Sequence, residues 1–464
     1  MHPWESFISG LRQWSPPDHT LSYLWSVRTP LFETLEIAAA AMLIAISLGL
    51  LLGLYIGARL PGARALYVLL TSFRAIPDLT LALLCVIAIG LGPAAGVVAL
   101  AMFYSAAIGK IFADLFASAE RAPVEALEST GANRIMVALY GLLPLRRQDL
   151  LTSGAYEFES AIRASVVVGF VGAGGIGTEL VGYLNQTDYH HATPLILLLV
   201  LLIALVDGLC WLVRRHPRLV LPLIVLGAAA AFANRPQTLY FRHAIKTFAA
   251  MWPPRLAPNE LASLPKLLGE TLEMAFGGTL LAIVCALPLG VAAARNISPA
   301  FVSFPVRRLL EGLRAIPEMV WGLILLGFAV WGPSMGILAL GLHSAGALGK
   351  LYAESLENVN PEPILALAAT GASRIAITSF GLLPLAFGPV AVQSLFRLEW
   401  NMRAATIVGM IGAGGIGGAL FYAQQQSFYH PMIAYIIITW ALIMIVDRIS
   451  GRLRSRWGIV EIDK

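Results

Sequence analysis

The residues best suited to chemistry are arginines that interrupt long apolar stretches. Arg74 and Arg314 each lie in such a stretch. Each is followed four positions later by an acid, Asp78 or Glu318. A guanidinium group binds a tetrahedral oxyanion in bidentate fashion, so two of them facing one cleft would attract such an anion. Pairing with the nearby acid at a helix end, or a place in the structure of a gate, explains the same residues. The sequence leaves both interpretations open.

Two further pairs of opposite charges also lie in apolar stretches. Glu159 and Arg163 are four residues apart, and so are Glu399 and Arg403. Residues at this spacing lie on one face of a helix, so the members of each pair can neutralise one another. Charges within a membrane are costly and commonly line a translocation pathway. Structural pairing is one expectation, and a place on the pathway or its gate is the other.

The sequence does not support covalent catalysis or a nucleotide-binding site. The segment 172–177 matches the glycine spacing of a dinucleotide site, but it lacks the acid about twenty residues later and the soluble βαβ unit that such a site needs. Gly349-Lys350 is not a phosphate loop, because Ser344 occupies the position of the first glycine. The three cysteines have no paired spacing. We therefore expect no catalytic residue, cofactor or metal on this chain.

The composition is that of a membrane protein. Of 464 residues, 58% are hydrophobic and 13% are charged, whereas soluble domains carry about a quarter charged residues. Apolar runs of about twenty residues recur, and each could cross about 30 Å of hydrocarbon as a helix. Arginine and lysine lie mostly in short loops between these runs and thus resemble topology signals. We expect an all-α polytopic protein whose surroundings are a lipid bilayer, with no nucleic-acid partner.

An internal repeat organises the chain. The stretch 125–177 returns as 365–417 with a constant offset of 240 positions. A duplicated, glycine-punctuated segment between apolar runs is typical of a transporter with two-fold pseudosymmetry. We expect the glycines of this segment to let the backbone leave the helix at the outer end of the pathway, where half-spans meet. These glycines are Gly174, Gly175, Gly414 and Gly415.

Ten spans are expected in the two halves. They cover residues 33–57, 65–91 (broken near Pro77), 92–119, 143–171 and 193–213, then 272–295, 305–330, 332–356, 383–411 and 431–449. The positive-inside rule places the repeated loop in the cytoplasm in both halves. Five spans would invert the second half, so an eleventh crossing is needed, and residues 219–233 are the candidate. The expected parts are an outer segment (1–30), a first half (31–218), a linking span with an outer segment (219–266), a second half (267–450) and a cytoplasmic tail (451–464).

The repeated cytoplasmic loop carries a signature of its own. Pro123 fits a helix start and Gly131 a helix end, so a short helix should protrude there. Glu125-Ala126, Gly131 and the Gly-Leu-Leu-Pro at 141–144 resemble the loop with which permeases of ABC importers contact their ATPase. The resemblance implies coupling residues Glu125, Ala126, Gly131 and Arg134, and in the second copy Ala366, Gly371 and Arg374. Leu365 replaces Glu125 in that copy, so the second loop departs from the family's pattern at this position.

Beyond the loop, the resemblance narrows to one type of importer. Phe158-Glu159, Ile162-Arg163-Ala164 and the segment 171–177, together with their second copies, look like the permease of phosphonate-type ABC importers. The chain is similar to two such permeases fused. This implies a duplicated type I ABC importer permease fold of about eleven transmembrane helices.

The same resemblance implies partners, location and substrate. It suggests two copies of an ATPase that hold ATP and Mg²⁺, an extracytoplasmic substrate-binding protein, and a multi-pass location in the cytoplasmic membrane. The substrate would be a phosphonate, phosphite or phosphate. An importer of methionine or an osmoprotectant, and an ion-coupled secondary transporter, are the alternatives.

Overall fold

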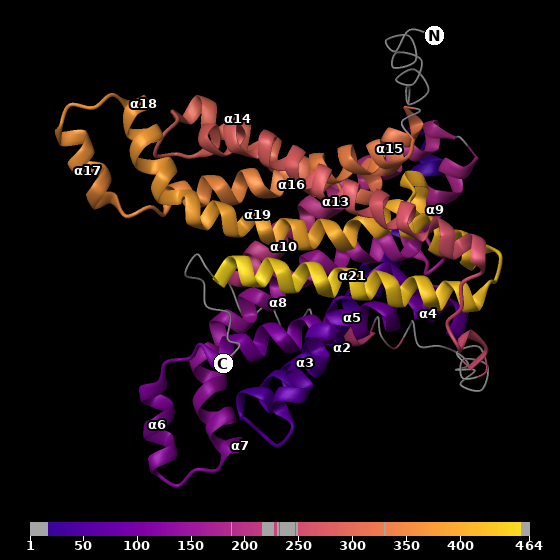
Figure 1. Cartoon of the computed structure of the whole chain (residues 1–464), viewed down its shortest axis with the longest axis horizontal. Coiled ribbons are helices and arrows are strands. Elements are labelled where there is room, and N and C mark those ends of the chain that lie inside the picture. The colour runs from indigo at the N-terminus through magenta and orange to yellow at the C-terminus, as the bar shows by residue number, and fades with distance from the viewer. Residues whose placement is uncertain are drawn as a thin grey trace. The chain divides into compact units, whose positions relative to one another are not determined.

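The computed structural model describes residues 17–186, 188–215, 227–229, 232, 246, 249–328 and 331–455. Within these ranges every regular element is helical (Figure 1). The chain divides into two compact units on either side of the Pro253–Pro254 bond. This division follows the sequence repeat, and each unit is described by itself.

The first unit contains the elements of one complete copy. They are α2 (Leu21–Gly57), α3 (Ala63–Arg74), α4 (Asp78–Ile89), α5 (Pro93–Ala117), α6 (Arg121–Ser129), α7 (Arg134–Met136), the π-helical turn η1 (Val137–Leu142), α8 (Leu143–Gly169), α9 (Gly175–Asn185) and α10 (Tyr189–Arg215).

The second unit repeats this order. Its elements are α13 (Pro258–Ala293), α14 (Ala300–Ala315), α15 (Glu318–Gly327), α16 (Pro333–Glu357), α17 (Pro361–Ala369), α18 (Arg374–Ile377), η3 (Thr378–Leu382), α19 (Leu383–Val408), η4 (Gly409–Ala413), α20 (Gly415–Gln425) and α21 (Tyr429–Ser455).

All ten expected spans correspond to helices. Six helices are long and apolar enough to cross a membrane, and the pair α3 and α4 becomes a seventh span if it is counted as one. The remaining three spans, formed by α8, by α14 with α15 and by α16, are interrupted by charged or polar side chains. The predicted eleventh span, 219–233, lies outside the described residues except for 227–229 and 232, and it stays a prediction.

The second span is broken as expected. α3 and α4 meet at 88°, and Pro77 immediately precedes α4. Proline lacks the N–H that would continue the helix and disfavours helical geometry in the residue before it. α14 likewise ends before Pro317, and α15 begins at Glu318.

The closest helix pair in each unit is built on small residues. α2 packs along α5, and α13 along α16. A Cβ at Gly53 would lie 2.7 Å from the Cβ of Phe112, and a Cβ at Gly290 would lie 2.9 Å from that of Tyr352. Gly53 and Gly290 occupy equivalent positions in the two copies. Glycine therefore allows the backbones to approach closely, as is usual where helices pack inside a membrane.

Candidate functional site

The repeated loop forms a short helix that turns back at a glycine in both units. α6 ends where Gly131, with φ at 83°, donates its N–H to the Glu128 carbonyl at 3.0 Å. Gly371 has a φ of 80° at the end of α17. This left-handed geometry is the usual way to stop a helix, and glycine adopts it without steric cost. The helix end predicted at Gly131 is confirmed.

Both short helices expose most of their surface. α6 and α17, which are fully described, contain no buried residue, and each projects from one end of its own unit in Figure 1. Ile135 is 53% exposed and Ile375 is 79% exposed in the following short helices. Exposed apolar side chains among polar ones are typical of an interaction surface.

The predicted coupling residues all lie on these exposed loops. Glu125, Ala126, Gly131, Arg134, Ala366, Gly371 and Arg374 are solvent-exposed. Arg134 also donates a hydrogen bond to the Arg59 carbonyl at 2.8 Å, which ties the loop to the connection between α2 and α3. Contact with an ATPase remains a prediction for each of them.

The arginines at the helix breaks lie at helix ends. Arg74 is in the last turn of α3, and Asp78 is in the first turn of α4. Arg314 and Glu318 occupy the same positions on α14 and α15. A cation at the C-terminus of a helix and an anion at the N-terminus both complement the helix dipole. This geometry supports the helix-end interpretation, and contact with substrate stays a prediction.

Further groups surround each break. In the second unit the Nε2 atom of His343 lies 3.5 Å from a Glu318 carboxylate oxygen, and its Nδ1 atom lies 2.9 Å from the Ile316 carbonyl. In the first unit Arg74 and Glu157 interact electrostatically. The two breaks are thus embedded in polar clusters of different composition.

The expected charge pair of the first unit is confirmed. The Nη1 atom of Arg163 lies 2.7 Å from Oε1 of Glu159, and both side chains are largely buried. At four-residue spacing on α8, this contact neutralises both charges inside the helical bundle.

The corresponding pair of the second unit was predicted wrongly. Glu399 pairs with Arg454, whose guanidinium group also stacks on the ring of Phe396 at 4.1 Å. Arg403 lies 3.7 Å from Asp447 instead. Both new partners come from α21, so contacts between helices replace the contact expected within α19. Arg454 is one of the arginines that follow the last apolar run, where the sequence predicts cytoplasmic charges, yet it is only 3% exposed.

A reversal of charge between the units went unnoticed in the sequence. Glu157 of the first copy aligns with Arg397 of the second. The Nε atom of Arg397 donates to the Ser344 hydroxyl at 2.7 Å, and that hydroxyl donates to Asn401 at 2.9 Å. The constant offset of 240 positions could have revealed this difference.

The unequal clusters follow from that reversal. Five aligned positions carry charge near the break and the buried pair: 74 and 314, 78 and 318, 157 and 397, 159 and 399, and 163 and 403. The first copy holds three carboxylates and two guanidinium groups there, and the second holds two carboxylates and three guanidinium groups. At these positions the second copy therefore carries one more positive charge and one fewer negative charge than the first.

The glycine-rich segments form tight turns before α9 and α20. Gly174, Gly175, Gly414 and Gly415 have φ values of 85°, 75°, 89° and 65°. The Gly175 N–H donates to the Glu33 carboxylate at 2.9 Å, and the Gly415 N–H donates to that of Glu270 at 2.7 Å. Carboxylates thus cap the free N–H groups at the starts of these helices. A pathway or gate role for the glycines stays a prediction.

The duplicated helical unit, its broken span and its exposed short helix define the class of protein. The chain belongs to the family of binding-protein-dependent transport system inner membrane components, whose sequence model matches residues 45–219 and again 286–459. It is a multi-pass permease subunit of an ABC importer and not an enzyme. Proteins of this class work with an ATPase and a substrate-binding protein.

Two relatives of this chain are named for the transport of phosphorus anions. The chain is 30% identical over 408 residues to the phosphate-import permease protein PhnE of Mycolicibacterium smegmatis, which covers 83% of this chain and 76% of the relative. It is 38% identical over 189 residues to the phosphite transport system permease protein PtxC of Stutzerimonas stutzeri, which covers 40% of this chain and 69% of the relative.

Proposed function

We propose that this chain forms both membrane halves of an ATP-driven importer that carries a phosphorus oxyanion, such as a phosphonate, phosphite or phosphate, across the cytoplasmic membrane. The observation that carries the proposal is the duplication of an entire permease unit, exposed loop included, in a chain whose relatives are named for phosphate and phosphite transport. The inner-membrane description of the family supports the location.

The energy would come from two ATPase copies, one on each exposed loop. The α6–α7 and α17–α18 loops are equivalent, and each lies at the end of its own unit, which supports one ATPase per loop. ATP and Mg²⁺ would be held by the ATPase. Its closure on ATP and opening after hydrolysis would shift the permease between two conformations, so that the substrate meets one side at a time. A substrate-binding protein would deliver the anion from outside.

The partly buried arginines fit the proposed substrate. Guanidinium groups at Arg74, Arg314 and Arg397 can neutralise an oxyanion and bind two of its oxygens at once. Each lies within or beside a polar cluster of one unit. The first selection among these anions would nevertheless be made by the substrate-binding protein.

Proteoliposomes containing the chain, the ATPase and the binding protein test this function. We expect uptake of radiolabelled phosphate, phosphite or a small phosphonate that requires ATP on the ATPase side. Methionine and glycine betaine serve as control solutes. Transport by the chain without the ATPase, or transport of a control solute in place of the phosphorus anions, would refute the proposal.

A further inference from the structure

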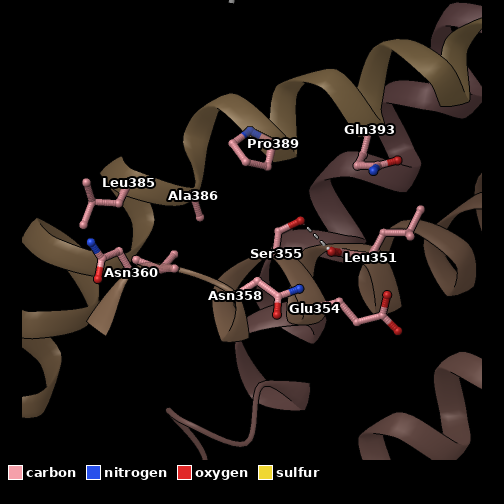
Figure 2. Close-up of a pocket in the computed structure, with 10 residues that line it drawn as sticks. Leu351, Glu354, Ser355, Asn358, Asn360, Leu385, Ala386, Pro389 and Gln393 are labelled. Atoms are coloured by element: carbon pink, nitrogen blue, oxygen red, sulfur yellow. Dashed lines mark hydrogen bonds between the residues drawn. The ribbon is translucent and has the colours of Figure 1, made fainter. Parts of the chain in front are cut away.

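A pocket lies beside the second exposed loop. It holds about 470 Å³ between the end of α16, the residues just before α17, and α19. Figure 2 shows Ala386, Pro389 and Gln393 along α19, facing Glu354 and Asn358 of α16. The wall is therefore part apolar and part polar, with one carboxylate.

The first copy explains the shape of this pocket. Arg146 aligns with Ala386, Ser118 with Asn358, and Asp149 with Pro389. In the first unit the Arg146 guanidinium group donates to the Ser118 carbonyl at the end of α5 and contacts the Ser118 hydroxyl at 3.3 Å. The same group pairs with Asp149 at 2.9 Å. An arginine thus joins the start of α8 to the end of α5.

The second copy has lost this arginine and, with Pro389 in place of Asp149, its carboxylate partner, but it keeps the helix end that the arginine contacts in the first copy. Asn358 caps the end of α16 with its N–H bonded to the Glu354 carbonyl at 3.0 Å, as Ser118 does on α5. The carbonyl end of a long helix favours a positive charge. The Glu354 carboxylate adds a negative charge, although Lys350 lies 3.9 Å from it. Ala386, which replaces the arginine, is itself buried, and the pocket lies beside it.

The position of the pocket indicates where a cation would come from. Asn360 lines it and is also the residue that caps the start of α17. A protein docked on α17 would reach the opening with a side chain. We propose that the pocket receives an arginine side chain of the ATPase bound at this loop, in the place that Arg146 fills from within the chain in the first copy. This inference rests on the proposed function, because it requires an ATPase on α17.

Charge substitutions at the pocket wall test the inference. The apparent Kd of the ATPase for the full chain in lipid nanodiscs is measured for Gln393→Glu and Gln393→Lys, which differ in charge at a partly exposed position. We expect Gln393→Lys to raise the Kd about fivefold and Gln393→Glu to lower it by a similar factor, the effect of one partly screened charge. Ala386→Arg, which restores the arginine of the first copy, should also raise the Kd about fivefold.

Ser153 provides the matched control, because it aligns with Gln393 in the copy whose arginine is already in place. Ser153→Glu and Ser153→Lys should leave the Kd unchanged. Equal Kd values for the two Gln393 variants would overturn the pocket inference and leave the proposed function standing. Failure of the ATPase to bind the unaltered chain would instead overturn the proposed function.

A second measurement identifies the residue that enters. Each arginine of the ATPase surface is replaced by alanine, and its effect is measured with the unaltered chain and with Gln393→Lys. One of these ATPase variants should abolish the difference in Kd between Gln393→Lys and the unaltered chain. The introduced lysine then no longer faces an arginine that it would repel. If every arginine variant preserves that difference, no arginine occupies the pocket.

Discussion

Replacing Gly131 by valine tests whether the turn that ends α6 positions the ATPase. Gly131 has a φ of 83°, and a Cβ built there has no other described atom within 4 Å. The substitution therefore adds no clash, and its cost is the left-handed backbone, about 1–2 kcal/mol for a residue with a Cβ. That amount lowers the population of the turn by a factor of about 5–30.

The expected result is a matching loss of ATPase binding and of coupled ATP hydrolysis, because α6 no longer leaves the membrane body at its native angle. Both are measured on the reconstituted complex of chain, ATPase and binding protein. Gly131→Asn is the control, since asparagine tolerates the left-handed region better than other residues with a Cβ. It should retain most of the coupling.

Three outcomes separate the explanations. Unchanged binding and hydrolysis with Gly131→Val would refute the reasoning that the turn matters for coupling. An equal loss of binding and hydrolysis with valine and with asparagine would mean that the ATPase packs directly on Gly131. The absence of a side chain would then matter, and the backbone conformation would not. Gly371→Val, which imposes the same strain on the second loop, then shows whether the two loops contribute equally.

Other predictions address the buried charges. Arg74→Ala combined with Arg314→Ala should lower anion uptake about tenfold while ATPase binding persists; normal uptake in proteoliposomes would confine both arginines to a role at helix ends. Arg454→Leu should destabilise the chain by about 3–5 kcal/mol, because Glu399 is left buried without its partner. Thermal unfolding in detergent should show most of that loss recovered on adding Glu399→Leu, and no recovery would contradict the pairing. Arg397→Glu should slow uptake and Arg397→Lys should preserve it; equal rates would remove this charge from the pathway.

Much of the fold could be predicted because it depends on local properties of the sequence. Apolar runs mark the spans, Pro77 marks the break between α3 and α4, and Gly131 marks the end of α6. Two helices, α2 and α13, are nevertheless much longer than the apolar runs that predict them. α2 begins at Leu21 and α13 at Pro258, before the spans expected from residues 33 and 272. A helix can continue beyond the hydrocarbon, where hydropathy no longer marks it.

The site could be predicted only in part, because several contacts join residues far apart in the chain. Arg403 has an acid four residues before it, yet it lies 3.7 Å from Asp447 on another helix. A four-residue spacing permits a contact within one helix but does not require it. The packing of α21 against α19 brings Asp447 to Arg403 instead. Similarly, the Glu-Thr pair at 33–34 recurs in the sequence at 270–271. The hydrogen bond between its carboxylate and the glycine-rich turn joins residues more than 140 positions apart, which the sequence alone does not predict.

The differences between the copies have a common physical reason. In a dimer of identical permeases every substitution appears twice, so a charge introduced on one side is also introduced on the other. A fused chain removes this constraint. Arg397 can then replace the acid that its counterpart Glu157 keeps, and Ala386 can replace the counterpart of Arg146 beside the pocket of the second unit. Loop, pocket and charge cluster all diverge in composition while the helices keep their order. The fold is therefore held by features that both copies need, namely the glycine contacts, the broken span and the capped turns. Three of the positions that differ, 365, 386 and 397, lie on the exposed loop, beside the pocket and in the polar cluster near the helix break.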